Sequence, residues 1–176
     1  MKRIRTILLS LLSFLLLIYF AALFFPKTYS VERSIVINQP AEKLYQELSD
    51  YNTFKEWNPW TINDSATIKL IEGTPCQSGH KYSWEGGKTG KGHLTITETD
   101  SLRMIHSKLV MEAPMKSESE VYFTLEAVQE GTKVTWKNEG KLNYPLGRYF
   151  GFMIIDMLEK DFDKGLNNLK TYTETH

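Results

Sequence analysis

The sequence predicts an α+β fold in which a curved antiparallel sheet of about seven strands wraps a long C-terminal helix, behind one transmembrane helix. An uncharged apolar run fills the N-terminus, apolar and polar residues alternate over most of residues 67–142, and a longer apolar period begins after residue 145. Alternation is typical of half-buried strands, whereas steps of three and four residues are typical of an amphipathic helix. We therefore divide the chain into an N-terminal anchor, residues 1–26, and one folded domain, residues 27–176.

The first element is the apolar segment at residues 7–25, which carries no charged side chain. At about 1.5 Å per residue, a helix over this segment is roughly 28 Å long, close to the ~30 Å hydrocarbon core of a bilayer. Lys2, Arg3 and Arg5 precede the segment and Lys27 follows it, and this excess of positive charge predicts a cytoplasmic N-terminus. We expect a single-pass protein of the cell inner membrane with an extracytoplasmic domain.

A cleaved signal peptide is the alternative interpretation of this segment. Signal peptides usually have an apolar region of about 7 to 15 residues that ends at a small-x-small cleavage site. The segment here is longer, and it ends in Leu23, Phe24, Phe25 and Pro26, which do not form such a site. The pattern favours an uncleaved anchor.

One strand and two short helices are expected after the anchor. Residues 29–37 alternate in polarity, which predicts a strand with Val31 and Ile37 on one face. Pro40 suits the first turn of a helix, and the apolar residues that follow it recur at helical spacing up to Leu48. A second short helix is expected over residues 51–57, ending before Asn58.

Six further strands and one long helix complete the domain. The strand candidates are residues 67–72, 80–85, 93–99, 103–112, 117–129 and 132–141, and Gly, Pro, Asp and Ser residues mark the turns between them. Strands that are joined by short turns form an antiparallel meander. Between residues 146 and 172 the apolar side chains recur every three or four positions, which predicts a helix about 40 Å long.

These elements predict how the domain packs. The sheet has one apolar face, and the long helix is the only element large enough to cover it. The two short helices are expected to close one edge of the sheet. A strongly bent sheet that grips a helix leaves a gap between the two, and that gap is a natural site for a ligand.

A series of short segments occurs in the same order as these elements: residues 31–38 (VERSIVIN), 40–45 (PAEKLY), 48–50 (LSD), 57–60 (WNPW), 131–136 (GTKVTW) and 161–170 (DFDKGLNNLK). Together they resemble the START-like (SRPBCC) superfamily, and within it the polyketide cyclase/dehydrase and lipid-transport group. The resemblance covers about residues 29–174. It implies the helix-grip fold of the Bet v 1 pollen allergens and a hydrophobic cavity, but no particular reaction, because the superfamily includes both carriers and enzymes.

Apolar residues at alternating strand positions supply the candidate lining of that cavity. We expect these residues to form rows on one face of the sheet, opposite Met153, Met157 and Phe162 of the long helix. Aromatic and methionine side chains there would form an adaptable apolar wall. A fully packed interior is the alternative, because alternation alone does not distinguish a filled interior from a hollow one. The predicted ligand-binding residues are Trp57, Trp60, Trp84, Leu109, Met111, Phe123, Trp136, Met153 and Met157.

Charge and motif content argue against several other functions. The chain has 21 Lys and Arg and 21 Asp and Glu, and three of the basic residues precede the apolar segment, so the domain is mildly acidic and unsuited to nucleic acid. The four His and the single Cys, Cys76, show no metal-ligand spacing, and no motif for a cofactor or a catalytic nucleophile is present. We therefore expect a module that binds a hydrophobic small molecule or lipid, with no metal, cofactor or catalytic residue.

Two other functions stay open at this point. A cyclase or dehydratase acting on a hydrophobic substrate would need an acid/base pair in the cavity, and the polar candidates nearest to it are Glu85, His106, Asn138 and Glu139. A module that binds a partner at the membrane surface is the third possibility. The sequence specifies neither the ligand nor the oligomeric state.

Overall fold

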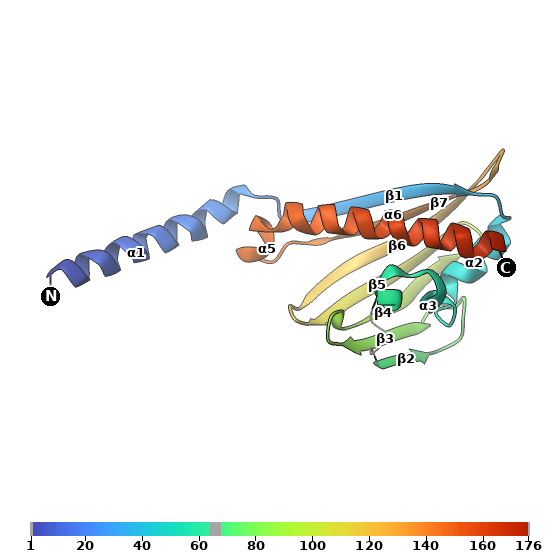
Figure 1. Ribbon diagram of the computed structural model, residues 1–176, viewed down its shortest axis with the longest axis horizontal. Helices are drawn as coiled ribbons and strands as arrows, with labels where there is room; N and C mark the ends of the chain where they lie inside the picture. The colour runs from blue at the N-terminus through green and yellow to red at the C-terminus, as the bar shows by residue number, and fades with distance from the viewer. Residues whose placement is uncertain (1, 64–67, 176) are drawn as a thin grey trace.

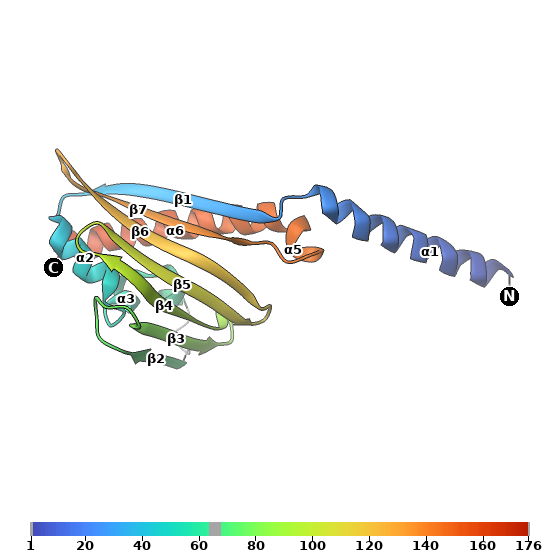
Figure 2. The same ribbon diagram turned by 180° about the vertical axis from the view of Figure 1, so that it is seen from behind.

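The computed structural model describes residues 2–63 and 68–175 and confirms the α+β fold (Figures 1 and 2). Helix α1 (Lys2–Ala21) continues into a short 3-10 helix, η1 (Ala22–Phe24). Strand β1 (Thr28–Ile37) precedes three short helices, α2 (Ala41–Ser49), α3 (Phe54–Trp57) and α4 (Pro59–Asn63). The next strands are β2 (Ile68–Glu72), β3 (Lys81–Gly86), β4 (Gly90–Asp100), β5 (Met104–Ala113), β6 (Ser117–Val128) and β7 (Gly131–Lys141). Helices α5 (Leu146–Tyr149) and α6 (Gly151–Thr175) follow β7.

The seven strands form one antiparallel sheet in the order β1-β7-β6-β5-β4-β3-β2. Strands β2 to β7 are the expected meander, and β1 completes the sheet by pairing with β7. Helices α2, α3 and α6 lie on one side of the sheet, and Figure 2 shows the strands from the other side. We call the side toward α6 the inner face and the opposite side the outer face. The end of the domain next to α1 is the proximal end, and the end with the C-terminus is the distal end.

The segment after α2 differs from the expected one. Helix α3 covers only the last part of residues 51–57, and a further helix, α4, begins directly after it. Asn58 accounts for this second start, because its Oδ1 accepts hydrogen bonds from the backbone N–H of Trp60 (3.0 Å) and Thr61 (3.4 Å). Pro59 then occupies the first helical position, where its missing N–H has no consequence. Thr67, which was expected to begin β2, lies outside the described residues.

The predicted C-terminal helix is divided into two helices. Helix α5 ends at Tyr149, Phe150 separates the helices, and α6 then runs for 25 residues, or about 37 Å. A Cβ atom at Gly151 would lie 2.6 Å from Cδ1 of Leu142, so a larger residue there would require the Leu142 side chain to move. The long amphipathic helix is thus confirmed, with a break that its apolar period does not reveal.

The core lies between the inner face and helices α2, α3 and α6. Arg33 on β1 forms ion pairs with Glu159 (2.7 Å) and Asp163 (3.4 Å) of α6, which align the helix along β1. The expected apolar stripe on α6 is buried, and its fully buried residues are Phe162, Leu166 and Leu169. The distal end is closed by α2 and α3, which bury Leu44, Leu48, Phe54 and Trp57.

Helix α1 projects away from the domain (Figure 1). Residues Arg3–Phe24 form a helix that contains an 18-residue window with a mean hydropathy of 2.7, so it is long and apolar enough to cross a bilayer or to serve as a signal sequence. Most of its side chains are exposed. The N-terminal apolar helix is therefore a candidate anchor, in agreement with the sequence.

Candidate functional site

The inner face of the sheet changes from closed to open along the strands. At the distal end the paired residues Ile105, Phe123 and Trp136 form a cross-strand row, and each of them is buried. Nearer the proximal end, Trp84 and Met111 lie on either side of Gly92 in a parallel row, and both side chains are only half-buried. The covering helices therefore seal one end of the inner face and leave large apolar side chains accessible at the other.

The distal part, which we call the closed half, consists of Trp57, Trp60, Phe123, Trp136 and Phe162. The Trp136 and Phe162 rings stack, with 4.2 Å between their centroids and 7° between their planes. Trp57, Trp60 and Phe123 surround Trp136, with ring centroids 4.9 to 5.9 Å from it. A Cβ atom on Gly165 of α6 would lie 2.7 Å from the Trp136 ring, so helix and sheet are in full contact here. The closed half is a packed aromatic core, and the predicted residues within it are not the walls of a cavity.

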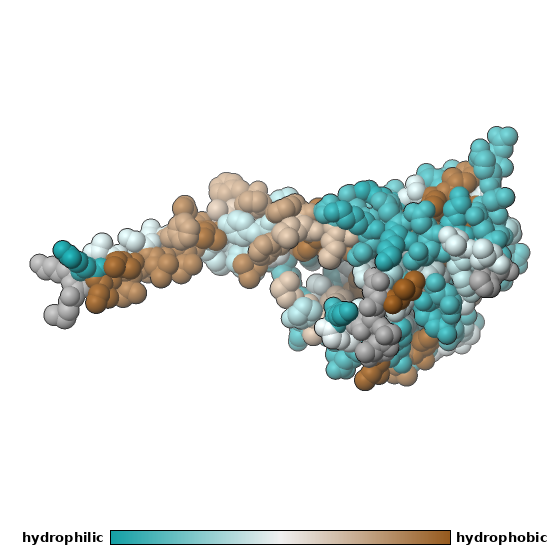
Figure 3. Space-filling model, in the orientation of Figure 1, coloured by the Kyte–Doolittle hydropathy of each residue, from teal (hydrophilic) through white to brown (hydrophobic). Residues whose placement is uncertain are grey.

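The proximal part, which we call the open half, consists of Trp84, Leu109 and Met111 on the sheet with Ile155 and Leu158 on α6. All five side chains are partly buried, and apart from Met111 they pack against the core. Glycine at position 92 makes room for Trp84, because a Cβ atom there would lie 2.8 Å from its ring. The Trp84 indole N–H donates to the Thr89 carbonyl (3.2 Å), which holds the ring in place. Figure 3 shows the surface hollowed beneath the first turns of α6.

One polar cluster lies on the inner face beside the open half. The Tyr29 hydroxyl donates to Oδ1 of Asn138 (2.7 Å), and Nδ2 of Asn138 donates to Oγ of Ser119 (2.9 Å). Asn138 and Ser119 are buried, and Gly140 lets the Tyr29 ring approach, because a Cβ atom there would lie 2.9 Å from it. Burial raises the pKa of the Tyr29 phenol, and the Ser119 hydroxyl lowers it in part. The cluster is therefore uncharged at neutral pH, and it offers hydrogen bonds within an apolar wall.

The four residues considered for acid/base catalysis do not come together. Glu85 pairs with Lys91 (3.0 Å), His106 pairs with Glu120 (2.8 Å), and both pairs lie on the outer face. Glu139 also lies on the outer face, in an ion pair with its neighbour Lys137 (2.6 Å). Asn138 alone reaches the inner face, so three of the four candidates are separated from the open half by the sheet.

The two methionines of α6 lie elsewhere than expected. Met153 and Met157 are each 54% exposed, and they project from the side of α6 that points away from the sheet. The expectation that they face the sheet beside Phe162 is wrong, because at 100° per residue they fall nearly opposite Phe162 on the helix. Ile155 and Leu158 share the face of Phe162. They occupy the position facing the sheet that we had assigned to Met153 and Met157.

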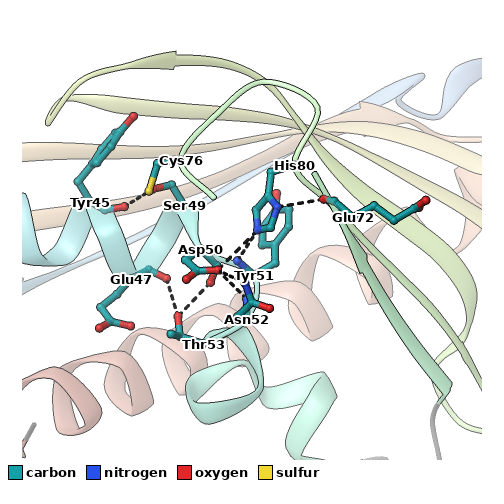
Figure 4. Close-up of polar contacts among 10 residues, drawn as sticks. All are labelled: Tyr45, Glu47, Ser49, Asp50, Tyr51, Asn52, Thr53, Glu72, Cys76 and His80. Carbon is teal, nitrogen blue, oxygen red and sulfur yellow. Dashed lines mark hydrogen bonds and ion pairs between the residues drawn. The ribbon is translucent and has the colours of Figure 1, made fainter. Parts of the chain in front are cut away.

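Sequence reasoning missed a second buried polar cluster, at the distal end (Figure 4). The Tyr51 backbone N–H donates to Nε2 of His80 (3.0 Å), so Nδ1 carries the proton and donates to the Glu72 carbonyl (3.0 Å). The Tyr51 ring stacks on the imidazole at 4.9 Å, and His80 is fully buried. Both ring nitrogens of His80 are occupied, so this histidine joins the α2–α3 segment to the β2–β3 loop and has no lone pair free for catalysis.

Cys76 lies next to this cluster and is half-buried. Its backbone N–H donates to the Ser49 carbonyl (3.0 Å), and its Sγ lies 3.1 Å from Oγ of Ser49. Within residues 2–63 and 68–175, no group of three His, Cys, Asp or Glu side chains is placed to hold a metal ion.

Comparison with known proteins gives a family and a fold. Residues 28–174 match the family described as polyketide cyclase/dehydrase and lipid transport. No curated protein matches the chain. A protein of unknown function from Staphylococcus aureus has a similar structure, with 16% sequence identity and a TM-score of 0.62, over 85% of this chain and 95% of that one. A protein from Chromobacterium violaceum aligns with 17% identity and a TM-score of 0.56, over 85% of this chain and 98% of that one.

A third similar structure is DynU16, a protein in the dynemicin biosynthetic locus. It aligns with 14% identity and a TM-score of 0.60, over 83% of this chain and 47% of its own length. Identities this low show a shared fold alone. The match covers 83% of this chain, so it supports the sheet and helix arrangement described above.

Proposed function

The chain belongs to the polyketide cyclase/dehydrase and lipid transport family, and from this premise we propose that it is a membrane-anchored binding protein for a hydrophobic small molecule or lipid. The ligand is held without covalent chemistry on the open half of the inner face, against Trp84, Leu109 and Met111. Helix α1 anchors the protein in the inner membrane, with Lys2, Arg3 and Arg5 on the cytoplasmic side and the domain outside.

The partial exposure of the apolar residues in the open half is the observation that carries this proposal. Burial of apolar surface contributes about 25 cal/mol per Å², and the closed half shows that this sheet and helix can bury their aromatic residues completely. Leu109 and Met111 stay accessible on a concave face beside a closed core. A hydrophobic ligand that covers them buries apolar surface that the fold itself leaves exposed to water.

The polar cluster suits orientation of that ligand better than catalysis. A phenol, a hydroxyl and an amide donate and accept hydrogen bonds, and none of them exchanges a proton readily at neutral pH. The Tyr29 hydroxyl and the Asn138 amide already donate their hydrogens, to Asn138 Oδ1, to Ser119 Oγ and to the Glu120 carbonyl. A hydroxyl or another donor group on an otherwise apolar molecule would find the remaining oxygen lone pairs of this cluster as acceptors. The cyclase or dehydratase alternative would instead need an acid/base pair there, and Glu85, His106 and Glu139 lie on the outer face.

The anchor supports the proposal because it keeps the domain where apolar molecules are concentrated. A tether keeps the open half close to the bilayer, where apolar molecules are concentrated, and so replaces a bimolecular encounter in water by a local one. Residues 25–27 leave only a short connection between η1 and β1, which keeps the domain near the end of the anchor.

Photo-crosslinking tests the proposal directly. The full chain is reconstituted in phosphatidylethanolamine/phosphatidylglycerol vesicles that contain a photoactivatable fatty acid, and the modified peptides are identified by mass spectrometry. We expect modification on β3 and β5 near Trp84, Leu109 and Met111. Met111→Trp, which fills the open half, should reduce this labelling several-fold, whereas the control Met115→Trp in the exposed β5–β6 turn should not. Labelling confined to α1 and α5 contradicts the proposal.

A further inference from the structure

Helix α5 and the start of α6 expose an unusual amount of apolar surface for a folded domain. Leu146, Phe150, Phe152 and Met153 are between 51% and 71% exposed and are close together in the sequence. We call these four residues the collar. Large exposed apolar side chains in such a group are typical of surfaces that contact another apolar phase.

The residues that flank the collar in the sequence contact the end of the apolar helix. The Tyr144 hydroxyl donates to the Tyr19 carbonyl, and the Tyr149 hydroxyl donates to the Ile18 carbonyl. Nη1 of Arg148 donates to the Ala22 carbonyl (3.3 Å). Aromatic contacts add to these bonds, because the Tyr19 and Tyr144 rings are 4.8 Å apart, as are the Phe25 and Tyr149 rings. The domain therefore contacts α1 directly, so the short connection between them is not the only link.

These contacts set the depth of the collar. Ile18 lies six residues before Phe24, where the apolar span ends, so the Tyr149 hydroxyl contacts α1 about 9 Å inside that end at 1.5 Å per residue. The headgroup region adds roughly 5–8 Å on each side of the ~30 Å hydrocarbon core. If α1 crosses the bilayer, α5 and the first turn of α6 must lie at the level of the interface.

The composition of α6 supports the same location. Its distal turns expose Asp163, Lys164 and Asn167, as expected of a helix side in water. Its first turn instead exposes Phe152 and Met153. One turn beyond the collar, Asp156 and Lys160 form an ion pair (2.6 Å), and Met157 is the last exposed large apolar side chain of the helix. The exposed side of one helix thus changes from apolar to charged with distance from the anchor.

We infer that the collar is a second membrane contact, immersed in the interfacial region of the outer leaflet beside α1. This inference deepens the proposed function and rests on its anchoring part. Tyrosine, phenylalanine and arginine are residues that favour this region, and an amphipathic helix with an apolar side lies in it readily. The collar fixes the orientation of the domain and directs the proximal end, with the open half, toward the lipid.

Depth-dependent fluorescence quenching tests the inference on the full chain. Phe152→Cys and the matched control Asn167→Cys, both exposed on α6, are each made in a Cys76→Ser background and labelled with the environment-sensitive dye NBD. The proteins are reconstituted in phosphatidylethanolamine/phosphatidylglycerol vesicles with and without brominated lipid. We expect NBD at position 152 to emit at shorter wavelength and to be quenched several-fold more by brominated lipid than NBD at position 167. Leu146→Cys should behave like Phe152→Cys.

The outcomes separate the collar from the anchor and from the ligand. Equal quenching at positions 152 and 167, in protein that stays with the vesicles after a carbonate wash, overturns the inference while the anchor stands. Protection of position 152 from aqueous iodide without quenching by brominated lipid also overturns it, because a second protein then covers the collar. Release of the chain from the vesicles by carbonate contradicts both the transmembrane anchor and the membrane contact of the collar. Binding of the fatty-acid probe is measured separately by the crosslinking experiment, so failure of the ligand proposal is distinguishable from each of these results.

Discussion

Replacement of Phe162 by alanine should destabilise the domain by about 3 kcal/mol or more. Phe162 is 1% exposed, and its ring stacks on the Trp136 ring. The centroids of the Phe162 and Trp60 rings are 6.3 Å apart. Loss of a buried phenylalanine ring costs about 3–5 kcal/mol, which combines the transfer of the removed atoms with the cavity that is left behind. Alanine recovers about 0.5 kcal/mol through its higher helix propensity, so the lower part of that range is expected.

Phe152→Ala is the matched control, because it makes the same substitution in the same helix at a side chain that is 71% exposed. Its free energy of unfolding should stay within about 0.5 kcal/mol of the wild-type value. Urea unfolding of residues 27–176, monitored by tryptophan fluorescence, gives the free energy of unfolding of both variants. The dependence of that free energy on urea concentration is held equal for the two. If Phe162→Ala loses less than about 1 kcal/mol, the closed half is not a packed core and the division of the inner face is wrong.

Three further predictions use the same unfolding assay. Gly165→Val should cost about 2 kcal/mol or more by overpacking against Trp136, whereas Gly87→Val, whose Cβ meets nothing within 4 Å, should be nearly neutral. His80→Ala should cost about 2–5 kcal/mol, because it removes a fully buried ring and leaves the buried Tyr51 N–H without its hydrogen-bond partner. Burial raises the pKa of Tyr82 to about 12, against about 10 in an unfolded chain, so its contribution to stability is complete below pH 10 and is lost as the pH rises toward 12. Tyr82→Phe should therefore lose less stability than the wild type between pH 10 and pH 12.

Strand alternation predicted the two faces of the sheet well. Ile96, Ile105, Val121 and Val134 all lie on the buried inner face, as their spacing indicated. This worked because the side-chain period of a strand is two, so a single register assigns every residue of a strand to a face. The same rule, applied to His106 and Glu139, already places them opposite these apolar neighbours.

The first turns of α6 do not identify their buried face when taken alone, because Phe152, Met153, Ile155 and Met157 make this segment apolar on every side. Only extension of the stripe from Phe162 at 100° per residue places Ile155 toward the sheet and Met153 opposite it. The buried face is fixed by the pairing of Arg33 with Glu159 and Asp163, which is a tertiary contact. Tyr29 and Ser119 were not predicted as partners of Asn138 for a related reason, because the three residues come from three strands whose register only the fold sets.

The division of the inner face separates the part that maintains the fold from the part that is proposed to bind. The aromatic residues of the closed half hold α6 against the sheet, so the open half can be filled or emptied without loss of the core. The exposed Phe152 and Met153 gain nothing from this packing, and burial of such side chains is favourable only in surroundings less polar than water. Because the collar and the open half share the proximal end, a hydrophobic molecule that leaves the lipid beside α5 would reach Met111 and Leu109 over a short path along apolar side chains. Under the proposed function, the anchor therefore determines from which phase the ligand is acquired, and the polar cluster of Tyr29, Ser119 and Asn138 determines which end of the ligand enters first.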